Sequence, residues 1–203
     1  MPTKWNRGAR ESGQLRVYNM GGGWSAAVNA AINTFNTLGL GVQLVAVNDK
    51  DVADIHVKLS NGADFIEKGA IKLMAGFTAD QLHGRARTRA SSGSRKREPE
   101  IDFAGVFLPG KVQNVTPKQK EVITVHELIH ASGLDGGIPG GGQHPNMDHD
   151  DIGIMVANMK VDGDGLIEYL ADKNAKPMTP IRIGAKTLCT MRMLWKNEGC
   201  EHN

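Results

Sequence analysis

The segment 117–131, PKQKEVITVHELIHA, constrains this chain most, because it indicates both the ends of a helix and the chemistry of its faces. Thr116 can act as the N-cap, Pro117 suits the first helical position, and Gln119 completes a capping box. Gly133 can adopt the left-handed conformation that ends a helix. The pattern therefore predicts a helix that begins after Thr116 and stops near Gly133.

Two faces of this predicted helix differ in character. Val122, Val125 and Ile129 recur at spacings of three and four, which predicts a stripe that packs into a core. His126 and His130 are four residues apart, so their side chains lie one turn above each other, with Cβ atoms about 5–6 Å apart. Two imidazole nitrogens at this spacing can bind the same ion.

Glu127 completes an HExxH pattern with these histidines, which is typical of a zinc peptidase helix. Its side chain is turned about 100° from that of His126, so we expect it to reach a water on the ion rather than the ion itself. Zinc with three protein ligands keeps a position for water and lowers the pKa of that water to about 7. The candidate zinc ligands are therefore His126 and His130, and the candidate general base is Glu127. The alternative is an ordinary helix with exposed side chains, but the helix-end signals favour a metal site.

The length of 203 residues and the hydrophobic content of 40% are sufficient for a proper core, and we expect one catalytic domain over 1–203. The net charge of +2 requires no acidic partner, but six cations and no acid lie in 84–97, GRARTRASSGSRKR. We interpret 84–97 as a solvated basic loop, with a nucleic-acid contact as the alternative. It lacks interleaved aromatic residues, so stacking on bases is not supported.

The N-terminal stretch 1–13 lacks the apolar run of a signal peptide, and no later segment approaches the roughly 18 apolar residues of a membrane span. We therefore expect no membrane partner and a cytoplasmic or virion-associated location. We also expect a monomer. The two cysteines, Cys189 and Cys200, can form one bridge, but reduced thiols are expected in a cytoplasm.

Hydrophobic periodicity predicts the remaining elements. A helix is expected over 25–38 and a final helix from Ala185. Expected strands lie at 15–18, at 42–47 as a buried strand, at 55–59 as a half-exposed strand, near 82–88, and at 101–108. His56 is interpreted as a surface residue on the polar face of its strand. This order predicts a mixed sheet with helices packed against it.

After Gly133 the chain is rich in glycine over 136–142 and then continues as QHPNMDHDDIGIM, 143–155. Together with HELIHASG, 126–133, this segment resembles the metzincin clan of zinc metalloproteases, most nearly its matrixin-like and snapalysin-like members. The pattern of that clan is HExxHxxGxxH followed by a Met-turn. The resemblance covers 126–155 well and 17–155 loosely.

The resemblance implies an α+β fold with an upper lobe, about 14–133, that holds a twisted mixed sheet and two long helices. A small irregular lower lobe, about 134–203, would carry the Met-turn and a C-terminal helix. The residue roles that it implies are zinc ligands His126 and His130, general base Glu127, turn residue Gly133 and Met-turn methionine Met155.

One position departs from the clan pattern, because the third ligand would fall on Gly136, which has no side chain. We interpret the glycine-rich stretch as an insertion that delays this ligand. His149, six residues before Met155, is favoured as the third ligand because the chain would pass directly into the Met-turn, and His144 is the alternative. Carboxylates also bind zinc, which leaves four further candidates: Asp135, Asp148, Asp150 and Asp151.

The sequence thus predicts a zinc-dependent metalloendopeptidase whose peptide or protein substrate lies extended beside an edge strand. Two alternatives stay open. One is a metal-binding structural or virion-associated protein with little activity, and the other is a nucleic-acid-associated module that uses the 84–97 basic loop.

Overall fold

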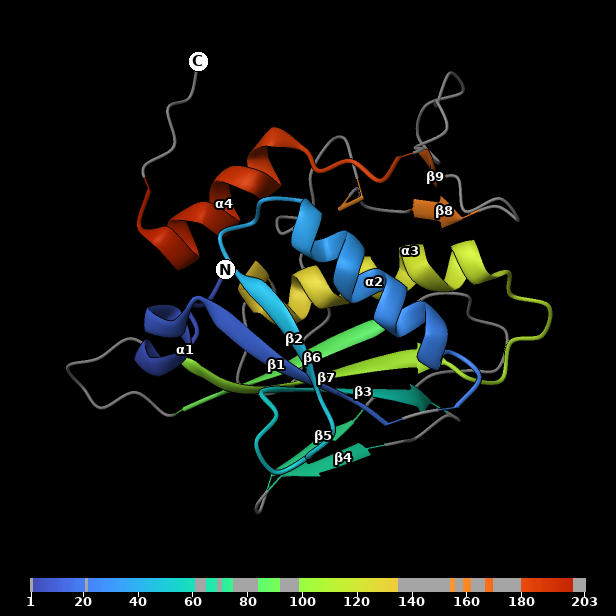
Figure 1. Cartoon of the computed structure of the whole chain (residues 1–203), viewed down its shortest axis with the longest axis horizontal. Coiled ribbons are helices and arrows are strands. Elements are labelled where there is room, and N and C mark those ends of the chain that lie inside the picture. The colour runs from blue at the N-terminus through green and yellow to red at the C-terminus, as the bar shows by residue number, and fades with distance from the viewer. Residues whose placement is uncertain are drawn as a thin grey trace.

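The computed structural model of the chain describes residues 2–20, 22–60, 65–68, 71–74, 84–91, 99–134, 154–155, 159–161, 167–169 and 180–198. These residues form an α+β protein built on a five-stranded mixed sheet. The helices α2 (Ser25–Thr37), α3 (Pro117–Ile129) and α4 (Ala185–Lys196) lie on one side of the sheet (Figure 1). The short hairpin of β4 (Phe65–Lys68) and β5 (Ile71–Met74) lies on the other side.

The sheet has the strand order β2-β1-β3-β7-β6. Its strands are β1 (Gln14–Asn19), β2 (Gln43–Val47), β3 (Ile55–Ser60), β6 (Arg85–Ala90) and β7 (Ile101–Pro109). The first four strands in this order are parallel, whereas β6 runs antiparallel to β7. Among the described residues β6 pairs with β7 alone, so one edge of β6 has no strand partner there. The remaining elements are α1 (Arg7–Ser12), the π-helix η1 (His130–Leu134), β8 (Met159–Val161) and β9 (Ile167–Tyr169).

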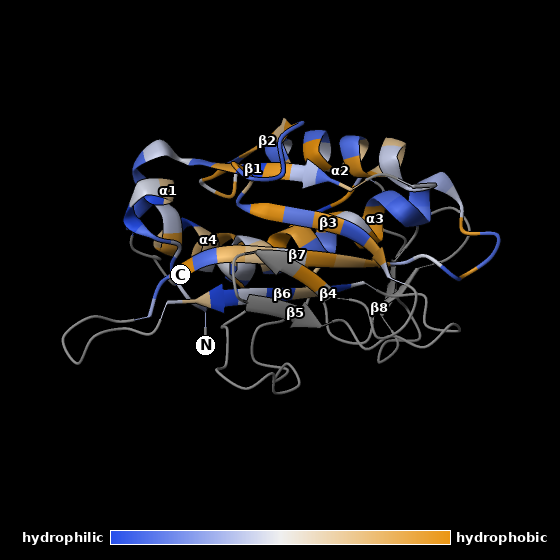
Figure 2. Ribbon diagram, turned by 90° about the horizontal axis from the view of Figure 1, so that it is seen from below, coloured by the Kyte–Doolittle hydropathy of each residue, from blue (hydrophilic) through white to orange (hydrophobic). Residues whose placement is uncertain are grey.

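The main core lies between the sheet and the helices. β7 is hydrophobic along nearly its whole length (Figure 2), and most of its residues are buried. The predicted stripe of Val122, Val125 and Ile129 on α3 is fully buried. Ile123 and Leu128 are buried as well, so α3 is covered on more sides than its stripe predicted.

The strand predicted at 42–47 is present as β2, but the prediction that it is buried is wrong, because β2 lies at the edge of the sheet and Val45 is 39% exposed. A run of apolar residues indicates a strand, but not how many neighbours will cover it.

The interpretation of His56 as a surface residue is also wrong, because this side chain is only 4% exposed. Its Nε2 lies 2.9 Å from the Lys50 carbonyl oxygen, and its ring makes edge-to-face contacts with Tyr18 and Phe103. On this face of the sheet, Phe103 also packs with Phe107 and with Ile66 of β4 in a second, small core. Strand alternation identified the face of His56 correctly, but it does not reveal that other residues cover the face.

The predicted C-terminal helix is confirmed as α4, which buries Met191, Leu194 and Trp195. The expectation of reduced thiols is wrong for Cys189, which is disulfide-bonded. The only other cysteine of the chain, Cys200, lies outside the described residues. Composition alone did not determine the redox state of Cys189.

The described helices include none that combines the length and the apolar character needed to cross a membrane.

Candidate metal centre

The N-terminal end of α3 is built as predicted. The Thr116 hydroxyl accepts a hydrogen bond from the backbone N–H of Gln119 at 3.2 Å, and the Gln119 side chain accepts one from the Thr116 backbone N–H at 2.9 Å. Pro117 occupies the first turn, where no N–H is needed. This reciprocal cap determines where the helix begins.

The other end of α3 widens into η1 and stops at Gly133, whose φ is +117°. This is backbone space that residues with a Cβ rarely adopt. A Cβ at Gly133 would also lie 2.8 Å from the Thr3 carbonyl oxygen. Glycine is therefore needed here both for conformation and for space.

His126 and His130 point toward each other. Their Nε2 atoms are 3.1 Å apart, and the two side chains are buried. Two nitrogens held at about 2.0–2.1 Å by one tetrahedral zinc ion lie about 3.3 Å apart. The pair therefore fits one metal ion with very little rearrangement.

A backbone carbonyl determines the tautomer of His126. Its Nδ1 lies 2.8 Å from the carbonyl oxygen of Ile154. A carbonyl oxygen only accepts hydrogen bonds, so Nδ1 carries the proton and Nε2 directs its lone pair toward His130. The sequence did not predict the contact of Ile154 with His126, because any residue can supply a backbone carbonyl. The only sequence signal for this contact was the position of Ile154 next to Met155.

Ile154 and Met155 form a buried turn beside this histidine. The Ile154 backbone N–H donates to the Arg182 carbonyl at 2.9 Å, which ties the turn to the segment that leads into α4. The predicted Met-turn residue thus lies next in sequence to the residue that orients His126.

The side chain of Glu127 lies at the start of β6. Glu127 is 5% exposed, and its side chain lies against Gly84, the residue immediately before β6. Sequence reasoning assigned Gly84 to a basic loop and gave it no role in the site. Only its contact with Glu127 identifies it.

The carbonyls of η1, where α3 ends, accept hydrogen bonds from distant parts of the chain. The Trp5 indole donates to the Ala131 carbonyl at 3.1 Å, and the Trp195 indole donates to the Ser132 carbonyl at 2.9 Å. The backbone N–H of Thr3 donates to the Gly133 carbonyl at 3.0 Å. The N-terminal segment and α4 therefore hold the helix end jointly. No sequence motif indicated these contacts.

All candidates for the third ligand lie outside the described residues: His144, His149, Asp135, Asp148, Asp150 and Asp151. In the part of the chain that the structure describes, no set of three His, Cys, Asp or Glu side chains forms a group able to hold a metal. The preference for His149 over His144 thus stays a prediction.

The stretch 84–97 is not a loop throughout, because six of its fourteen residues form β6, which confirms the strand expected near 82–88. Arg85, Arg87 and Arg89 belong to β6, and Arg89 forms an ion pair with Asp102 at 2.6 Å. Its guanidinium also lies over the ring of Phe103. Residues 92–98 of this stretch lie outside the described residues.

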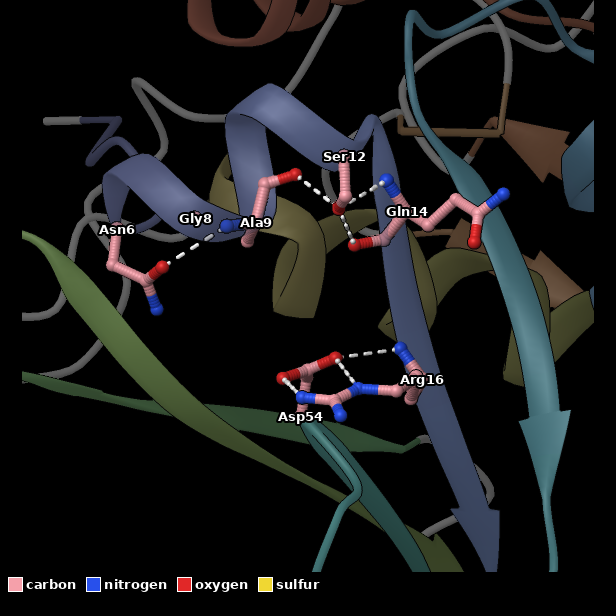
Figure 3. Close-up of a pocket in the computed structure, with 7 residues that line it drawn as sticks. All are labelled: Asn6, Gly8, Ala9, Ser12, Gln14, Arg16 and Asp54. Atoms are coloured by element: carbon pink, nitrogen blue, oxygen red, sulfur yellow. Dashed lines mark hydrogen bonds and ion pairs between the residues drawn. The ribbon is translucent and has the colours of Figure 1, made fainter.

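A cavity of about 390 Å³ lies beside α1 and the start of β1, and it contains none of the predicted site residues (Figure 3). Its lining residues are Asn6, Gly8, Ala9, Ser12, Gln14, Arg16 and Asp54. Arg16 makes two 2.9 Å contacts with the Asp54 carboxylate, and this hydrogen bonding raises the pKa of Arg16. The polar side chains of this cavity bond mainly to one another or to nearby backbone, so we assign it no chemistry.

No protein-family model and no curated protein sequence matches this chain. Its function must therefore be inferred from the geometry of its own residues.

Proposed function

We propose that this protein is a zinc-dependent metalloendopeptidase of the metzincin type. The observation that carries the proposal is the pair of buried histidines with Nε2 atoms 3.1 Å apart and with the Nδ1 atom of His126 bonded to Ile154. Oriented imidazoles of this kind are typical of metal ligands, whose outer nitrogen usually donates to a carbonyl or carboxylate. His126, His130 and His149, with His144 as the alternative, would hold the ion.

When bound, zinc supplies a Lewis acid that polarises the scissile carbonyl and brings the pKa of water to about 7. Glu127 accepts the proton of the attacking water as the water oxygen bonds to the carbonyl carbon. It then passes this proton to the amine as the C–N bond breaks. Burial of Glu127 supports this role, because a carboxylate screened from bulk water interacts more strongly with the reacting groups.

The sheet supports a peptide as the substrate. β6 has one edge without a strand partner among the described residues, and Glu127 lies against the residue that precedes this strand. An extended peptide that adds to this edge by backbone hydrogen bonds would pass the carboxylate. The substrate is therefore a segment of peptide or protein in extended conformation.

The architecture is compatible with the proposed clan. The five-stranded mixed sheet is accompanied by the helices α2 and α3, each of 13 residues, and α4 follows near the C-terminus. The buried Ile154–Met155 turn next to His126 supports the assignment of Met155 to a Met-turn.

Zinc content and hydrolysis of an unstructured protein such as casein, measured before chelation, after chelation and after return of zinc, test the proposal. We expect about one zinc per chain, loss of hydrolysis on chelation and recovery with zinc. Purified protein that binds zinc but cleaves nothing would instead support the metal-binding structural or virion-associated alternative. The nucleic-acid alternative predicts binding that falls steeply with salt and does not depend on zinc.

A further inference from the structure

Gly84 is located where the edge strand meets the helix of the candidate site. A Cβ added at Gly84 would lie 2.3 Å from Cγ of Glu127, 2.9 Å from its Cδ and 3.0 Å from its Oε1. Real Cβ atoms essentially never approach another heavy atom more closely than 3.0 Å. All three of the nearest atoms belong to Glu127, so the space that glycine leaves is filled by this one side chain.

Backbone conformation does not require glycine at this position. Gly84 is not among the described glycines with positive φ, in contrast to Gly133. An alanine would therefore fit the local backbone and conflict only with Glu127. This makes the constraint specific to the carboxylate side chain.

Glu127 has little freedom to avoid such a Cβ. It is nearly fully buried, and its neighbours on α3, Val125 and Leu128, are fully buried too. The helix cannot withdraw without disturbing this core, because interiors are close-packed. An added Cβ would thus force Glu127 into another rotamer.

We propose that Gly84 is a positioning residue that holds the Glu127 carboxylate in its working orientation at the start of β6. The inference rests on the proposed role of Glu127 as general base. The inference adds that the start of β6, the strand expected to bind the peptide, also orients the side chain of Glu127. Misplacing a catalytic group by about 1 Å can lower a rate by about 100-fold.

Gly84→Ala tests the inference. We expect kcat to fall roughly 10- to 100-fold, with KM and zinc affinity within about twofold of the wild type, because the three atoms nearest to the added methyl group all belong to Glu127. Gly23→Ala is the matched control, since no atom lies within 4 Å of the Cβ position of Gly23 and its φ is not positive. It should leave kcat unchanged. A Gly84→Ala enzyme with wild-type kcat would overturn the inference.

A stability cycle on the metal-free protein gives a second readout. Gly84→Ala should lower the unfolding temperature by roughly 3–10 °C in the wild type. In the Glu127→Ala background the conflict is absent, so the same change should have almost no effect. If Gly84→Ala alone does not fold, the double variant should fold. If Gly84→Ala lowers the unfolding temperature equally in both backgrounds, the added methyl group does not conflict with Glu127 and the inference is wrong.

The two proposals fail in different ways. A zinc-loaded wild type that hydrolyses no peptide would contradict the proposed function and therefore the positioning role. An active wild type with an equally active Gly84→Ala variant would contradict the positioning role alone.

Discussion

The two ends of α3 are stabilised in opposite ways. At the first end, Thr116 and Gln119 bond to each other within four residues of sequence. At the other end, the carbonyls of Ala131 and Ser132 accept hydrogen bonds from Trp5 and Trp195, which are near the two ends of the chain. The candidate ligands occupy the end that depends on these distant contacts. Metal binding should accordingly depend on tertiary structure, whereas the cap should contribute stability alone.

The largest expected effect is the loss of the third zinc ligand, which we expect the segment after α3 to supply. His149→Ala should lose bound zinc and hydrolysis together, because two histidines leave the ion without its third protein ligand. His144→Ala is the matched variant and should keep both. Zinc content after dialysis against a weak chelator measures the difference. Loss of zinc in His144→Ala alone would reverse the assignment.

Glu127→Gln should separate metal binding from chemistry at the same end of the helix. The amide is nearly isosteric but cannot accept the proton, so hydrolysis should fall roughly 10²- to 10⁴-fold while zinc stays bound. The assay is kcat on a fluorogenic peptide, with zinc content determined in parallel. Wild-type activity in Glu127→Gln would refute the role of general base.

Trp195→Phe should weaken the distant support of the helix end. It removes the N–H that bonds to the buried Ser132 carbonyl, at a cost of about 1–3 kcal/mol in the free energy of unfolding. Zinc affinity should fall by roughly tenfold, as for other groups that orient metal ligands. Chelator competition and urea unfolding measure the two effects.

The matched control for this variant is Trp24→Phe. Trp24 is buried and lies near the ammonium group of Lys120, close to the other end of α3. Its replacement should lower stability without changing zinc affinity. An equal loss of zinc affinity in both variants would remove the distinction between the two helix ends.

The smallest expected effect is that of Thr116→Ala. Loss of the cap should lower the free energy of unfolding by about 1 kcal/mol and leave zinc affinity and kcat unchanged. Thr116→Ser keeps the hydroxyl and should retain most of the stability. A marked drop in zinc affinity in Thr116→Ala would show that the capped end also controls the site.

Much of the candidate site could be predicted because it depends on local geometry. The cap at Thr116, the turn at Gly133 and the approach of His126 to His130 all follow from the regular rise and rotation of a helix. The strand β7 and the helix α4 were predictable for the same reason, since each is a periodic run with clear ends.

Two of the predictions that were wrong concerned what covers a residue. The face of His56 was predicted correctly, but its burial depends on Phe103 and on the small core that Ile66 and Phe107 complete. Val45 was expected to be buried, yet among the described strands β2 has a neighbour on one side only. Periodicity identifies the face of a side chain but not the segments that pack on it.

By itself the sequence determined a capped helix with a glycine end and with two histidines and a glutamate on adjoining faces. Tertiary structure alone decided that the Ile154 carbonyl orients His126, that Gly84 leaves space for Glu127, and that two indoles hold the helix end. The physical reason is the distance along the sequence over which each interaction acts. Helix caps and side-chain spacing act within a few residues, whereas a carbonyl, a missing methyl group or an indole N–H matters only after folding brings distant segments together.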